Sequence, residues 1–129
     1  MPKTVNEIYS MAKSLMFEKP SSTIYDQYLI GNINRVLREV YEENNMERMF
    51  RGKAPLKEVP YVVNREDIID YEDVYLNEII PLGLAAYFLI DDDLNKYSIY
   101  ITDYKNSRII NQKMVSQEVI DGFAANTEV

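Results

Sequence analysis

The acidic run after residue 90 has the residue types that binding of a cation would need. Asp91, Asp93 and Asn95 match the first three ligand positions of a calcium-binding loop. That loop also requires glycine at its sixth position and glutamate at its twelfth, where this chain has Lys96 and Thr102. Because the aspartates are also suited to ending one helix and capping the next, we expect no calcium or magnesium site here.

A second group of carboxylates, Glu39, Glu42 and Glu43, resembles the set that holds magnesium in all-helical nucleotide pyrophosphohydrolases. Those enzymes add an ExxD motif on the following helix, whereas the motif in this chain, Glu118 to Asp121, lies far away near the C-terminus. The run Arg51-Gly52-Lys53 lacks the other residues of a phosphate-binding loop. An enzyme of that kind is therefore the least favoured of the functions considered.

Composition excludes several other kinds of chemistry. The chain has 129 residues, enough for one domain, with 47% hydrophobic residues and 11 tyrosines. It has no cysteine or histidine, which removes thiolate nucleophiles, imidazole bases and the zinc sites built on them. A net charge of −7 argues against tight binding of nucleic acid. No signal peptide is evident, so we expect assembly in a cytoplasm. From the missing residue types we expect no catalytic residue and no cofactor.

The most apolar stretch, residues 72–90, predicts a central helix that is buried on two stripes. It is too short to span a membrane. Pro81 predicts a kink at 77–81 that leaves the carbonyl of Asn77 unpaired. Gly83 should let a neighbouring helix approach closely.

Two helices should precede this one, at 5–17 and 24–44, joined by a turn at Pro20. Thr4 and Glu7 form a capping box at the start of the first, and Thr23 with Asp26 resembles one at the start of the second. The charged pairs on the second helix, Arg35 with Glu39 and Arg38 with Glu42, have the spacing of weak surface ion pairs.

Residues 45–60 form the one basic stretch in this acidic chain and are punctuated by glycine and prolines. Two interpretations stay open: an irregular loop whose methionines cover the edge of the core, or a projecting contact loop. The residues concerned are Arg48, Met49, Phe50, Arg51 and Lys53. After it, residues 58–63 have a strand pattern and could form a small hairpin with 67–70, or an extended segment.

A last helix should run from Leu94 to about Lys113, capped by Asp92 or Asp93. Residues 1–113 thus form a mainly α four-helix domain, and 114–129 an extended C-terminal tail. The tail either folds back on the domain or becomes ordered on a partner. Its apolar residues are Met114, Val115, Val119, Ile120 and Phe123, and the expected core comprises Ile33, Leu37, Ile79, Leu82, Ala86, Leu89 and Ile101.

The order of these features resembles the head-to-tail connector proteins of tailed bacteriophages, also called adaptor or head completion proteins. The likeness covers residues 5–113. It consists of a helical hairpin, an irregular segment, Ile69-Asp70-Tyr71-Glu72 leading into an apolar helix with Gly83-Leu84-Ala85-Ala86, the acidic run Asp91 to Asp93, and a helix with Tyr97, Tyr100 and Tyr104.

The resemblance implies a structural virion protein without enzymatic activity, located in the neck of the particle. Such proteins form a ring of identical subunits, twelvefold in the virion, beneath the portal protein. They lengthen the DNA channel, bear the tail or stopper protein, and involve neither sequence-specific DNA contacts nor a membrane. Assembly would take place in the cytoplasm of the bacterial host.

On this interpretation, the tail from Met114 docks on the portal. The loop with Arg48, Arg51 and Lys53 contacts either acidic faces of the neighbouring subunit, which we favour, or DNA phosphates in the channel. The alternative of another class is a small acidic helical regulatory module that mimics DNA with its carboxylates.

Overall fold

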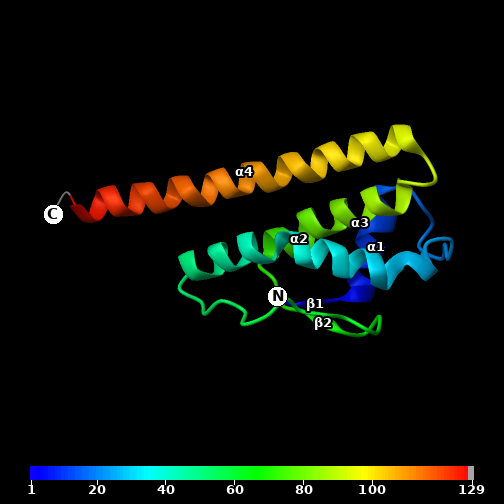
Figure 1. The fold of residues 1–129 in the computed structure, drawn as a ribbon, viewed down its shortest axis with the longest axis horizontal. Helices are drawn as coiled ribbons and strands as arrows, with labels where there is room; N and C mark the ends of the chain where they lie inside the picture. Colours follow the sequence, from blue (N-terminus) through cyan, green and yellow to red (C-terminus); the bar gives the residue numbers. More distant parts are fainter. Residues whose placement is uncertain (128–129) are drawn as a thin grey trace.

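The fold is mainly helical, with four α-helices and a small two-stranded sheet, as the sequence predicts. The computed structural model describes the backbone of residues 1–127 and the side chains of residues 1–118 and 121. The α-helices are α1 (Val5–Leu15), α2 (Leu29–Phe50), α3 (Ile80–Leu89) and α4 (Leu94–Thr127). Helix α3 packs against the other three, and nine of its ten residues are buried, so it forms the centre of the core (Figure 1).

Helix α1 begins at the predicted capping box. The Thr4 hydroxyl accepts the Glu7 amide at 3.1 Å, and the Glu7 carboxylate accepts the Thr4 amide at 3.2 Å. The helix ends at Leu15, two residues before the predicted end, because Phe17 adopts a positive φ of 60° that no α-helix can continue through.

The predicted hairpin between residues 58–63 and 67–70 does not form. Strand β2 (Ile68–Ile69) pairs instead with β1 (Lys3–Thr4) in an antiparallel register of Lys3 with Ile69. Residues 58–63 are extended but are bound by side chains: Asn34 of α2 donates to the Val62 carbonyl and accepts its amide, both at 2.9 Å. A side-chain amide thus replaces the ladder that the sequence pattern suggests.

Helix α2 is shifted along the chain relative to its prediction of 24–44. A 3-10 turn, η1 (Asp26–Tyr28), precedes it, without the predicted cap from Thr23 and Asp26 side chains. The helix continues past Asn44 and Asn45 to Phe50, because both asparagines bond to backbone outside the helix and do not compete with it. Beyond its C-cap, Arg51, Gly52 has a φ of 79°, which suits the residue that follows a helix C-terminus.

A π-helical turn, η2 (Tyr75–Ile79), leads into α3 near the predicted defect at Pro81. In this wider turn the Ile80 amide bonds to the Tyr75 carbonyl, five residues back. The extra residue rotates everything that follows, so spacing counted from Tyr75 places Leu82 wrongly in the core. Leu82 is only partly buried, as is Ile101, whereas Leu84 is completely buried.

Helix α4 continues for 34 residues to Thr127, so the prediction that it ends near Lys113 and gives way to an extended tail is wrong. Once Asp93 has capped the helix, no proline interrupts it, and each added residue gains a backbone hydrogen bond. At about 1.5 Å per residue it is roughly 50 Å long. Figure 1 shows its C-terminal part extending beyond the end of α2. No helix in the described part of the chain combines the length and apolarity needed to cross a membrane.

Candidate interaction surfaces

A row of three carboxylates on α2, one turn apart, faces α4. Glu39 accepts the hydroxyls of Tyr87 and Tyr104, each within 2.9 Å. One turn on, Glu43 accepts Arg108 Nε at 2.8 Å, and Glu47 accepts Asn111 Nδ2 at 2.8 Å. Each carboxylate of the row is thus engaged by an α3 or α4 side chain that holds the helices together.

Burial sets the electrostatics of this row. It raises the pKa of Glu43 above the usual 4.5, and the hydrogen bond from Arg108 only partly offsets that effect. Burial, followed by the hydrogen bond to Glu39, raises the pKa of Tyr87 to about 12. Arg35 forms the predicted ion pair with Glu39, at 3.8 Å, and its side chain is 49% exposed. Its guanidinium also lies 3.8 Å above the Tyr87 ring, a contact that the spacing does not suggest.

The carboxylates proposed for magnesium binding do not converge. Glu42 is exposed, Glu43 pairs with Arg108, and Asp121 of the ExxD motif accepts Gln117 on the distal part of α4. Within the described residues, no three acidic side chains come together in a way that could hold a metal ion.

In the acidic run after α3, one of the three aspartates caps the next helix, as the sequence predicts. The Asp93 carboxylate accepts the Lys96 amide at 3.1 Å and caps α4. Asp92 accepts the Tyr25 hydroxyl at 2.9 Å. Asp91 is exposed at the mouth of a cleft between the 24–32 segment and the end of α3.

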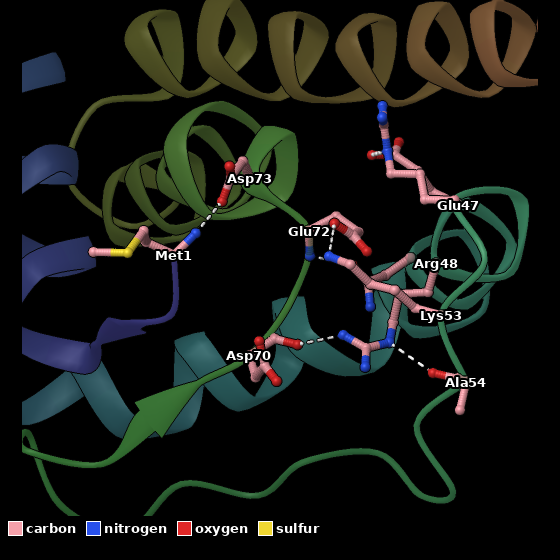
Figure 2. Close-up of polar contacts among 10 residues, drawn as sticks. Met1, Glu47, Arg48, Lys53, Ala54, Asp70, Glu72 and Asp73 are labelled. Atoms are coloured by element: carbon pink, nitrogen blue, oxygen red, sulfur yellow. Dashed lines mark hydrogen bonds and ion pairs between the residues drawn. The ribbon is translucent and has the colours of Figure 1, made fainter.

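The basic stretch proves to be the last turn of α2 and the turn after it. Figure 2 shows Arg48 donating to the carbonyls of Ala54 and Asp70, and Lys53 bound to Glu72 at 3.1 Å. Arg51 pairs with Glu47 at 3.3 Å. Arg48 therefore fastens residues 54–70 to α2, and Lys53 links the start of this segment to Glu72 at its end. Met49 and Phe50 beside them are 49% and 39% exposed.

The predicted docking tail lies on the distal part of α4. Met114 is 57% exposed, and Val115 is partly buried in a notch of about 120 Å³ between α4 and the end of α2. Met46 and Tyr75 also line this notch. The side chains of Val119, Ile120 and Phe123 lie outside the described residues.

Two surface hollows were missed from the sequence. One is an apolar groove of about 370 Å³ between α1, α3 and α4, lined by Met11, Leu15, Pro81, Leu82 and Ser107 among others. The other is the cleft beside Asp91, of about 340 Å³. Each draws its lining from segments far apart in the chain, so local periodicity carries no signal for it.

These features define a class of protein: a mainly helical domain with an overhanging terminal helix and apolar hollows at its surface. No family model, curated protein or solved structure is found to match the chain.

Proposed function

We propose that this chain is a structural subunit of a bacteriophage neck, which forms a ring beneath the portal, extends the DNA channel and joins head to tail. The proposal starts from the family resemblance over residues 5–113. The observation that carries it furthest is the shape of α4: its distal part reaches beyond α2 and leaves exposed apolar side chains and an unfilled notch (Figure 1).

The use of the charged side chains supports a structural role. The carboxylate row on α2 binds side chains of α3 and α4. Arg48 of α2 binds the segment that follows, and Lys53 in that segment binds Glu72. A DNA mimic would need its carboxylates to face solvent at phosphate-like intervals. Glu43 and Glu47, however, have side chains only 5% and 4% exposed, which does not favour that alternative.

The distal part of α4 is the docking arm in this proposal. Among the side chains that the structure describes, those of α4 that hydrogen-bond to the body are Tyr100, Tyr104, Arg108 and Asn111, and all precede Met114. Cutting the chain after Met114 should therefore leave the melting temperature almost unchanged while abolishing attachment to portal-bearing heads.

A second variant distinguishes the effect of the apolar side chains of the arm from the effect of removing the arm. Replacing Val119, Ile120 and Phe123 together by serine keeps the full length, and it should also abolish attachment, because apolar contact with the portal would be lost. Electron microscopy of purified protein with portal-bearing heads is the measurement. Heads completed normally by both variants would show that the arm does not dock on the portal.

A further inference from the structure

Helix α2 has surfaces of opposite character at its two ends. Its N-terminal end lies beside the turn between α3 and α4, and its C-terminal end lies on the opposite side of the molecule (Figure 1). The 22 residues of α2 separate the two surfaces by roughly 33 Å. The first is called the acidic end and the second the basic end below.

The acidic end is the cleft of about 340 Å³ described above. Its wall combines aromatic and apolar residues with polar ones, and Ile24 and Tyr28 are each more than half exposed. The charged groups in its lining are Asp91 and Asp92. The cleft lining comprises Ile24, Tyr25, Gln27, Tyr28, Asn32, Tyr87, Phe88, Ile90, Asp91 and Asp92.

The basic end presents three large apolar side chains, Met46, Met49 and Phe50. Two half-exposed cations lie beside them. The side chains of Arg51 and Lys53 are 50% and 53% exposed, whereas their partners Glu47 and Glu72 are only 4% and 7% exposed. Cations therefore face outward here although each has a carboxylate behind it.

We infer that the basic end of one copy of this chain binds the acidic end of the next copy. Flexible methionines and a phenylalanine suit an aromatic-walled cleft, and Arg51 and Lys53 would meet Asp91 and Asp92. The two surfaces are unlike and lie on opposite sides of the subunit, so the contact is head-to-tail and propagates until a ring closes. This inference rests on the proposed function, for which it assigns the contact between subunits.

Engineered disulfides test the contact directly, because the chain has no cysteine of its own. The double variant Ile24→Cys with Met49→Cys, oxidised at assembly concentration, should give a ladder of covalent dimers, trimers and larger species on a denaturing gel. A disulfide needs Cα atoms about 4.4–6.8 Å apart, so a bond within one chain is excluded. Either single variant alone should stay monomeric, because its cysteine faces no other cysteine across the contact. A mixture of both single variants should give the mixed dimer and no larger species.

Substitutions that change the charge of either end give an independent measurement. Met49→Glu and Asp91→Lys should each weaken assembly in analytical ultracentrifugation, and mixing the two variants should restore it, because each then offers the end that the other needs. Ile68→Glu is the matched control, since Ile68 is 67% exposed on β2, away from both ends, and should assemble like the parent.

The outcomes separate the contact from the function. Rings in electron micrographs without a cysteine ladder would overturn the contact and leave the proposed neck function standing. Absence of both rings and ladder, for protein alone and with portal-bearing heads, would overturn both.

Discussion

The close approach of α4 to Gly83 makes Gly83→Ala an informative substitution. A Cβ at this position would lie 2.7 Å from Cε1 and 3.0 Å from Cζ of Tyr104. The ring cannot easily move away, because Tyr104 is 1% exposed and its hydroxyl is bound to Glu39 at 2.8 Å. The added methyl group must therefore displace α4 or break that hydrogen bond.

Two opposing effects set the size of the change. Replacing glycine by alanine inside a helix stabilises it by about 1 kcal/mol. Overpacking a core costs roughly 1–3 kcal/mol, and a weakened hydrogen bond to a carboxylate costs about 1.5–3 kcal/mol more. We expect a net loss of about 1.5–5 kcal/mol in the free energy of unfolding, which would lower the melting temperature by several degrees.

Gly31→Ala is the matched control, since Gly31 is exposed in the first turn of α2 and a Cβ there meets no atom within 4 Å. It should stabilise the protein by about 0.5–1 kcal/mol. Urea unfolding of both variants measures the difference. In a Tyr104→Leu background, which lacks the ring atoms Cε1 and Cζ, Gly83→Ala should cost much less. Equal stabilisation by both alanines would refute the close packing of α4 on α3.

Three further predictions concern the core, the bonds of Asn34 to Val62, and the carboxylate row on α2. Leu84→Asp should unfold the domain, since Leu84 is completely buried, whereas Leu82→Asp should leave a folded protein by circular dichroism. Asn34→Ala leaves both backbone groups of buried Val62 unpaired and should cost roughly 2–4 kcal/mol in urea unfolding; a loss below 1 kcal/mol would contradict the bonding seen here. Because burial raises the pKa of Glu43, the folded state keeps a proton that the unfolded state releases, so this group makes stability fall as pH rises from 4.5 through the raised pKa. Glu43→Gln should remove that slope, and an unchanged pH dependence of unfolding would contradict the raised pKa.

Local signals predict the helices well and the connections poorly. The capping box at Thr4 and the apolar run of α3 depend on neighbours in sequence, and both are found in the structure. The end of α2 was placed six residues early, because the sequence cannot show that Asn44 and Asn45 bond to residues 72 and 56 instead of to their own helix. The strand pairing failed for the same reason, since Asn34 occupies the groups of Val62 that a hairpin would use.

The candidate site was predicted only in part. The basic residues after Asn45 and the apolar residues from Met114 onward stand out in the sequence as departures from the composition around them. Their surroundings are not visible, because Glu47 and Glu72 meet Arg51 and Lys53 only after folding. The rotation introduced by η2 likewise moves Leu82 out of the core through a backbone hydrogen-bond pattern that no residue type specifies.

The side-chain bonds from α2 to residues 51–72 also determine how this segment should open. The amides of Leu56, Val62 and Glu72 are each bound by an asparagine of α2, not by a neighbouring strand. Their protection against hydrogen exchange therefore depends on a folded α2, and it should be lost together with the protection of the α2 amides. Although residues 51–67 contain no regular secondary structure, they should unfold in the same cooperative unit as α2.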